Sequence, residues 1–319
     1  MAVGTTGESA LGRVTATAGR TSLAHIWKAH RQCYVLLIPS IICMAFFCYY
    51  PLWGVSLAFV KFNPFKGVLG SPFVGLAHFE RFFSSPNAWA IMRNTVIIAS
   101  GKLVLGQLTA VVFAIALDQV RQHWYKRLVQ TLSTLPHFLS WIIVGTVVTT
   151  ILAGDGLINR ALSAMGLPGL NFLGNPEVFP LTLIVTDVWK GFGWGAVIYL
   201  AALTAINHEL YEAAAIDGAG RWRRVWHVTL PGILPTIILM ACLNLGSILN
   251  AGFEQNLVLS NPMVYSTGDI IDTYVYRVGL LGFDYSLGAA LGLLRSLVGT
   301  VLILTSWWLA DRLANYRIF

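Results

Sequence analysis

The feature that most constrains this chain is a series of long apolar stretches, each able to cross a lipid bilayer. A helix needs about 20 mostly apolar residues to span the hydrocarbon core, because every backbone N–H and C=O must be satisfied inside the segment. Six stretches reach that length, so we predict an all-α polytopic membrane protein with six transmembrane helices. They lie at about residues 34–59, 91–117, 128–152, 181–206, 233–256 and 286–310.

The composition agrees with a membrane protein. Of 319 residues, 56% are hydrophobic and only 11% are charged, a balance that a soluble domain of this length does not need. The four cysteines, Cys33, Cys43, Cys48 and Cys242, lie in or beside apolar stretches and form no CxxC motif. We interpret them as small buried hydrophobic residues, so we predict neither a metal site nor a disulfide framework.

The distribution of basic residues predicts the orientation. An even number of spans puts both termini on one side, and short cytoplasmic loops carry an excess of Lys and Arg. With the termini inside, the cytoplasmic segments hold twelve of these residues and the outer segments six. We therefore predict that both termini are cytoplasmic, with residues 1–32 as a cytoplasmic tail. The same bias accounts for the net charge of +7 without a nucleic-acid partner.

The most polar long interruption in the second half of the sequence is residues 212–235, which overlap a predicted loop at 207–232. Asn207 can cap a first short helix, and Gly218 is a natural left-handed stop for it. Bulky or β-branched residues then recur at i, i+3, i+4 and i+7, which is the spacing of one helix face. These are Trp222, Val225, Trp226 and Thr229. The sequence predicts two short cytoplasmic helices around a glycine turn.

This interruption resembles the EAA loop of the membrane subunits of binding-protein-dependent ABC importers. That pattern is Glu-Ala-Ala, three residues, Gly, nine residues and Ile-x-Leu-Pro. The chain has Glu212-Ala213-Ala214, Gly218 and Val228-Thr229-Leu230-Pro231, with Val for Ile as the departure. The alternative is an amphipathic hairpin without a partner. The resemblance implies that an ATPase subunit contacts this loop through Glu212, Ala213, Ala214, Asp217, Gly218, Trp222, Val225 and Pro231.

The resemblance extends over roughly residues 30–315 and narrows to carbohydrate-importer permeases. The matching segments include Leu37-Ile38-Pro39, Tyr50-Pro51, Asn94-Thr95, and Asp269 through Arg277. The last of these is similar to the branch that takes up oligo- and polysaccharides, which includes alginate importers. Two departures are Asn207, where relatives often have Pro, and Val225, where an aromatic residue is common. Asn207 can still cap a helix, so the first departure changes little.

The resemblance implies a type I ABC importer permease fold in the bacterial cytoplasmic (inner) membrane. Residues 33–319 would form the permease domain, with 207–232 as its coupling loop. The implied partners are a second homologous permease, two ATPase subunits, an extracytoplasmic solute-binding protein and a saccharide. ATP and Mg²⁺ would be bound by the ATPase subunits. This chain has no complete phosphate-binding loop and no HExxH or GxSxG motif. We predict a non-catalytic subunit with no cofactor and no metal of its own.

Polar residues inside the spans are candidates for a substrate path, because such groups usually face a cavity or a partner. On one interpretation they bind sugar hydroxyls and stack on sugar rings, and the cations Lys190 and Arg295 suit an acidic saccharide. On the other they are contacts between helices, with Lys190 satisfied by Asp187 three residues earlier. The candidates are Asp187, Trp189, Lys190, Trp194, Asn244, Asn250, Glu254 and Arg295.

Further polar residues in the spans are Lys102, Gln107 and Gln255; Lys102 could instead extend its charge to the interface or pair with the second permease. Two other functional classes stay open: an ion-coupled carrier or channel for small polar solutes, and an intramembrane enzyme. A carrier of that kind usually shows a second repeated half, which this sequence lacks. An intramembrane enzyme would need a catalytic constellation, and we find none.

Overall fold

The computed structural model describes residues 23–246, 249 and 251–314, and within these residues the chain is mostly helical. It divides into two compact units, Met1–Trp53 and Gly54–Phe319. The described residues contain six helical stretches long and apolar enough to cross a membrane, which confirms the predicted fold class. These are Val35–Phe59, Ala88–Asp118, Trp141–Ala164, Phe179–Thr204, Arg221–Leu245 and Tyr285–Thr305.

The first unit consists of α1 (Leu23–Met44), followed by a π-helical turn at Ala45–Tyr49. A 3-10 stretch, Tyr50–Phe59, then leads into the second unit. The predicted tail extended to residue 32, whereas α1 begins within it and continues into the first apolar stretch. Residues 1–22 of that tail lie outside the described residues.

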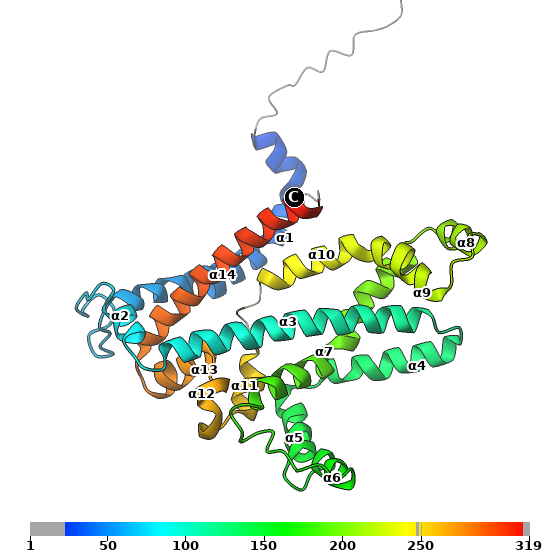
Figure 1. Cartoon of the computed structure of the whole chain (residues 1–319). Helices are drawn as coiled ribbons and strands as arrows, with labels where there is room; N and C mark the ends of the chain where they lie inside the picture. Colours follow the sequence, from blue (N-terminus) through cyan, green and yellow to red (C-terminus); the bar gives the residue numbers. More distant parts are fainter. Residues whose placement is uncertain (1–22, 247–248, 250, 315–319) are drawn as a thin grey trace, which may run out of the picture. The chain divides into compact units, whose positions relative to one another are not determined.

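The second unit is built around α3 and α7, which lie side by side with α4 next to them (Figure 1). Helices α8 and α9 lie at one end of α3, and α12 and α13 lie at the other. The helices are α2 (Ala77–Phe83), α3 (Ala88–Asp118), α4 (His123–Thr134), α5 (Trp141–Leu152), α6 (Leu157–Ala164), α7 (Phe179–Thr204), α8 (His208–Ile216), α9 (Arg221–Arg224), α10 (Leu230–Gly246), α11 (Phe253–Leu259), α12 (Tyr265–Gly268), α13 (Ile271–Tyr274) and α14 (Tyr285–Ala314). Short 3-10 or π turns join several of them, at Leu135–Phe138, Val225–Thr229, Pro262–Val264 and Val275–Leu281.

Small residues allow α3 and α7 to approach closely. In lipid there is little hydrophobic drive between helices, so their association depends on packing at short range. A Cβ atom at Gly195 of α7 would lie 3.2 Å from the Cβ of Ala110 on α3, and one at Gly101 would overlap the side chain of Ile184. On the other side of α7, a Cβ at Gly193 would overlap the backbone of Ser133 in α4. Glycines therefore set the spacing of the three helices.

The third predicted span, residues 128–152, is not one continuous helix. Helix α4 ends at Thr134 and α5 begins only at Trp141. The ring of Pro136 removes a backbone donor, which favours the 3-10 turn at this point. Ser140 then adopts an extended conformation and caps α5, because its hydroxyl accepts the N–H of Ile143 at 3.4 Å. Capping chemistry thus interrupts a stretch whose hydropathy alone predicted a single helix.

The fifth predicted span, residues 233–256, is also divided. Helix α10 begins earlier, at Leu230, and ends at Gly246. Helix α11 begins at Phe253, directly after Gly252, whose φ of +85° favours glycine. The polar residues at the predicted end of the span therefore lie on a separate short helix.

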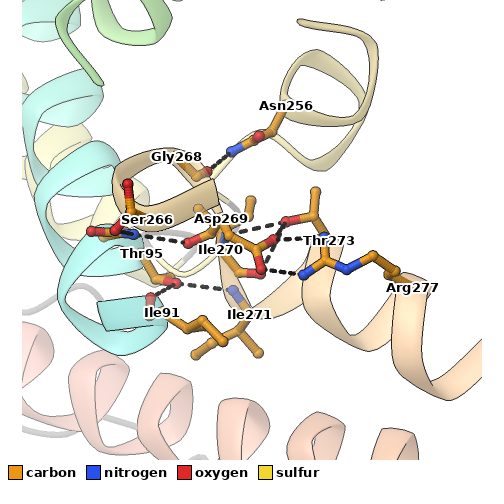
Figure 2. A network of polar contacts seen from close by, with 11 residues as sticks. Ile91, Thr95, Asn256, Ser266, Gly268, Asp269, Ile270, Ile271, Thr273 and Arg277 are labelled. Atoms are coloured by element: carbon orange, nitrogen blue, oxygen red, sulfur yellow. Dashed lines mark hydrogen bonds and ion pairs between the residues drawn. The ribbon is translucent and has the colours of Figure 1, made fainter. Parts of the chain in front are cut away.

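A buried polar network anchors α11, α12 and α13 to the first turns of α3 (Figure 2). Asn94 donates to two backbone carbonyls within residues 266–269. The hydroxyl of Thr95 accepts the backbone N–H of Ile271 at 3.0 Å, and Asn256 of α11 donates to the carbonyl of Gly268 at 2.7 Å. These side chains satisfy the backbone of an irregular segment, as buried polar groups require.

The same network holds a buried carboxylate. Asp269 is 4% exposed and pairs with the guanidinium of Arg277, while the hydroxyl of Thr273 donates to it at 2.7 Å. The guanidinium also lies over the ring of Tyr265, 4.2 Å from its centroid. The segment between α11 and α14 is therefore fixed by specific polar contacts.

We predict that Gly193→Ala destabilises the protein and that Gly191→Ala does not. A Cβ at Gly193 meets the backbone of α4, and overpacking of this kind costs about 1–3 kcal/mol. A Cβ at Gly191, two residues earlier in the same helix, meets no atom within 4 Å, and alanine there should gain about 0.5–1 kcal/mol of helix stability. Thermal unfolding in detergent measures both. Equal melting temperatures for the two variants would contradict the packing of α4 on α7.

Candidate functional site

A buried ammonium group joins three helices in the interior of the second unit. Lys102 of α3 has a side chain only 9% exposed, and its Nζ lies 3.7 Å from the carboxylate of Asp187 on α7. The same Nζ donates to the backbone carbonyl of Ala251 at 2.7 Å and to the side-chain oxygen of Gln255. All of these acceptors suit an ammonium group, which has three donors and no acceptor.

Gln255 extends this contact to α7. Its side chain is fully buried on α11, and its Nε2 donates to the carbonyl of Leu183 and to the hydroxyl of Thr186, both at 2.8 Å. One amide therefore accepts from α3 and donates to α7. We call the group Lys102, Asp187 and Gln255 the lysine cluster.

Two members of the lysine cluster, Lys102 and Asp187, line a cavity of about 310 Å³ among α3, α7 and α10. Two matched stripes line it, each with a charged residue followed by small residues at i+4 and i+8. The stripes are Lys102, Gly106 and Ala110 on α3, and Asp187, Gly191 and Gly195 on α7. Because helical residues four apart share a face, the stripes place charges at one part of the wall and leave space beyond them.

Amide and hydroxyl groups complete the wall. Asn244 of α10, Gln107 of α3 and Tyr199 of α7 all line the cavity. Gln107 also donates to the carbonyl of Ile237 at 2.7 Å, which connects α3 with α10. The cavity thus combines both charges with several hydrogen-bonding groups, which suits a polar ligand rather than lipid.

Of the predicted path residues that the structure describes, two lie at this cavity, Asp187 and Asn244. The pairing of Lys190 with Asp187, which was one of the two interpretations of these residues, does not form, because Asp187 pairs with Lys102. The spacing along α7 suggested Lys190 as the partner of Asp187. The partner in the folded protein, Lys102, belongs to α3.

Lys190 and Trp194 belong to a different group, at the turn between α4 and α5. Lys190 donates to the carbonyl of His137 at 3.0 Å, and its Nζ lies 5.3 Å from the ring centroid of Trp141. Trp194 stacks on the His137 ring with centroids 5.0 Å apart and planes 4° apart. These residues hold the α4–α5 turn against α7.

Arg295 is occupied by an acidic partner outside the cavity. Its guanidinium lies 2.5 Å from the carboxylate of Asp272 on α13. Burial raises the pKa of Asp272, and the charge of Arg295 acts in the opposite direction. This pair connects α14 to the segment that the Asp269 network holds.

Two further predicted path residues, Trp189 and Glu254, do not line the cavity. Trp189 is 45% exposed on α7. Glu254 is exposed on α11 and forms no ion pair among the residues that the structure describes. Asn250 lies outside the described residues.

Lys102, Gln107 and Gln255 were recognised as polar but were not among the predicted path residues. One sequence signal could have identified Lys102 as a candidate residue of the substrate path. Lys102 and Asp187 each precede small residues at i+4 and i+8, and such matched stripes indicate helices that face one another. Gln255 has no comparable signal, because its position depends on the break before α11.

The predicted hairpin forms at the far end of α7. The side chain of Asn207 accepts the N–H of Glu209 at 3.0 Å, which confirms it as the cap of α8. Gly218 has a φ of +71°, as predicted for a left-handed stop. The N–H of Gly218 bonds the carbonyl of Ala215 and the N–H of Ala219 bonds that of Ala214, so the last turn of α8 is closed.

The hairpin presents large apolar side chains. Trp222 is 79% exposed and Trp226 is 63% exposed, whereas Val225 is half-buried and Thr229 is buried. Of the four residues on the predicted helix face, only the two tryptophans are therefore exposed. Thr229 faces inward and forms a hydrogen bond of 3.0 Å with the hydroxyl of Tyr211, which joins α8 to the start of α10.

The other predicted coupling residues lie on the hairpin or on the first turn of α10. Glu212 and Ala213 are exposed on α8, Ala214 is half-buried, and Asp217 ends the helix. Pro231 is the second residue of α10 and is exposed. The structure locates these residues, and their contact with an ATPase stays a prediction.

Comparison with known proteins gives one family and close relatives. The model of the family described as "Binding-protein-dependent transport system inner membrane component" matches residues 102–315. Protein LplB of Bacillus subtilis is 39% identical over 92% of this chain and 92% of its own length. The polygalacturonan/rhamnogalacturonan transport system permease protein YteP of Bacillus subtilis is 40% identical over 88% of this chain and 87% of its own.

The fold also resembles a solved structure. A chain from the crystal structure of a bacterial ABC transporter involved in the import of the acidic polysaccharide alginate has a TM-score of 0.84 and 35% identity. The similarity covers 91% of this chain and 99% of that chain. Most of the chain therefore has a structural counterpart with the same fold.

We predict that Lys102→Met destabilises the protein by about 2–4 kcal/mol, because it leaves Gln255 and a backbone carbonyl without their charged donor. Lys61→Met is the matched control: Lys61 is exposed, and such surface changes stay within about 0.5 kcal/mol. The loss of stability caused by Asp187→Asn should lie between those of the other two variants, since Asp187 is partly exposed. Unfolding in mixed detergent micelles ranks the three, and a Lys102→Met protein as stable as Lys61→Met would refute the lysine cluster as a structural contact.

Proposed function

The chain belongs to the family of binding-protein-dependent transport system inner membrane components, and from this premise we propose that it moves oligo- or polysaccharides as one permease of an ATP-driven importer. It is a multi-pass protein of the inner membrane and a carbohydrate ABC permease by its relatives. The single observation that carries the proposed transport role is the polar cavity among α3, α7 and α10. Helices that pack only on one another in lipid have no need of such a cavity.

We propose an acidic polysaccharide as the substrate class. Two observations support it. One relative is described as a transporter of polygalacturonan and rhamnogalacturonan, and the similar solved transporter imports alginate. In this chain the cavity wall carries Lys102, whose charge is partly balanced by Asp187. A carboxylate on a sugar ring could compete with Asp187 for that ammonium, whereas a neutral sugar could use only the amides and hydroxyls.

The ATPase subunits would drive transport by contacting the hairpin of α8 and α9. With both termini cytoplasmic, as the basic residues predict, this hairpin faces the cytoplasm. Its exposed tryptophans suit a groove on an ATPase subunit, and Glu212 of α8 is exposed as well. The ATPase subunits would bind ATP and Mg²⁺, and this chain would contribute no catalytic group.

In the proposed transport cycle, most steps are carried out by the partner subunits. A solute-binding protein delivers the saccharide from outside, and a second permease completes the path. When the ATPase subunits close on ATP, each hairpin moves with the surface that it contacts. Because Tyr211 and Thr229 join the hairpin to α10, this movement reaches a helix that lines the cavity.

We predict that Gly218→Val uncouples transport from ATP hydrolysis and that Gly220→Val does not. Gly218 has a φ of +71°, which valine adopts only with strain, so the turn between α8 and α9 must change. Gly220 has a φ of −66°, which valine accepts. In the reconstituted importer, Gly218→Val should lose most saccharide-stimulated ATPase activity. Equal stimulation in both variants would argue against the hairpin as the coupling element.

We predict that Gly191→Leu blocks saccharide uptake and that Gly292→Leu leaves it intact. A side chain at Gly191 enters the cavity without meeting an atom within 4 Å at its Cβ, so it should fill space rather than disturb packing. Gly292 of α14 is equally open at its Cβ but does not line the cavity. Uptake of labelled oligosaccharide into proteoliposomes measures the effect. Normal uptake by Gly191→Leu would mean that the saccharide takes another route.

A further inference from the structure

A second, smaller cavity lies between the end of α3 and the hairpin, outside the proposed substrate path. Its volume is about 120 Å³. Three arginines line it: Arg121 follows α3, and Arg221 and Arg224 belong to α9. The hydroxyl of Tyr211 on α8 and the amide of Gln119 at the end of α3 complete a polar wall.

None of these three guanidinium groups has an acidic partner among the residues that the structure describes. Within the part of the chain that the structure describes, no carboxylate lies at ion-pair distance from any of them. The nearby cation Lys126 differs, because it pairs with Asp118 at 3.6 Å. Like charges that converge on one small cavity repel one another unless an anion balances them.

Arg224 gives a second, independent indication. Its Nε atom is buried and has no hydrogen-bond acceptor among the described residues. A buried donor without an acceptor costs about 1–3 kcal/mol, and more when it is charged. In native proteins such a group is usually satisfied by a ligand, an ion or water. The side chain is therefore suited to an acceptor that enters the cavity.

The size and donor set of the cavity favour a phosphate group. Its volume is about four times the roughly 30 Å³ that one water occupies in the liquid, so it has room for a group with four oxygens. Each guanidinium offers five N–H donors in a planar fork that matches phosphate. Three of them offer more donors than the two oxygens of a single carboxylate can use.

We propose that this cavity, formed by Arg121, Arg221 and Arg224, is an anion site that binds a phosphate group. The group comes either from free phosphate in solution or from a lipid headgroup. A bound phosphate would connect the end of α3 with α9, because Arg121 lies on one side and the other two arginines on the other. Occupancy would therefore fix the hairpin relative to α3.

Binding of inorganic phosphate to the purified full-length chain tests the proposal, independently of any transport activity. Phosphate is titrated at constant ionic strength and followed by thermal stability and by equilibrium dialysis with labelled phosphate. We expect saturable binding that Arg224→Gln weakens by at least about tenfold, because a charged hydrogen-bonding partner is lost. Arg221→Gln should have a similar effect, and it changes an exposed side chain that folding does not require.

The matched control is Arg223→Gln, which makes the same charge change in the same helix but does not line the cavity. It should leave phosphate affinity unchanged. The chain is compared in nanodiscs of a neutral lipid without phosphate (a galactolipid) and of phosphatidylglycerol: phosphate binding lost only in the second identifies the lipid headgroup as the source, and binding kept in both identifies free phosphate. Equal weakening by Arg223→Gln, or no saturable binding in either lipid, would overturn the proposal. So would phosphate binding that disappears when the ATPase subunits are added, because a protein carboxylate would then fill the site.

Discussion

The arrangement of the second unit depends on one electrostatic constraint, the ammonium group of Lys102 within a membrane-spanning helix. A charge at that depth persists only where acceptors surround it. The chain supplies them from three separate places: Asp187 on α7, Gln255 on α11, and the carbonyl of Ala251 just before α11. Satisfying a single group therefore fixes which faces of α3 and α7 meet and where the chain must stop being one continuous span.

The cavity follows from the same contact. Charged residues need room for their acceptors, and the small residues at i+4 and i+8 extend that room along both helices. On the same helices, glycines bring α3, α4 and α7 together by close packing. The bundle thus combines tight contact at Gly101, Gly193 and Gly195 with an open polar wall next to them. A path for a hydrophilic solute requires that combination, because packing must hold the helices while polar groups face the space between them.

Much of this architecture could be predicted from the sequence, and the exceptions share a physical cause. Apolar length predicted the number of spans in the described residues, and local chemistry predicted Asn207 as a cap and Gly218 as a left-handed stop. Each of these depends on residues close together in the chain. The break before α5 depends on Pro136 and Ser140, which lie within an apolar stretch. The hydropathy of that stretch does not predict a break in the helix.

The tertiary partners could not be predicted. Asp187 has Lys190 three residues away and Lys102 eighty-five positions away, and only the packed structure decides between them. For the same reason Arg295 and Lys190, both candidates for binding an acidic sugar, turned out to be occupied by Asp272 and by the α4–α5 turn.

The central claim that remains is that the cavity beside Lys102 carries the saccharide. Labelling of Asn244→Cys, in a chain otherwise without cysteine, tests it most directly. In the reconstituted importer, a membrane-impermeant maleimide should modify this position, and saturating saccharide should slow the reaction. A labelling rate that saccharide leaves unchanged while uptake proceeds would contradict the claim.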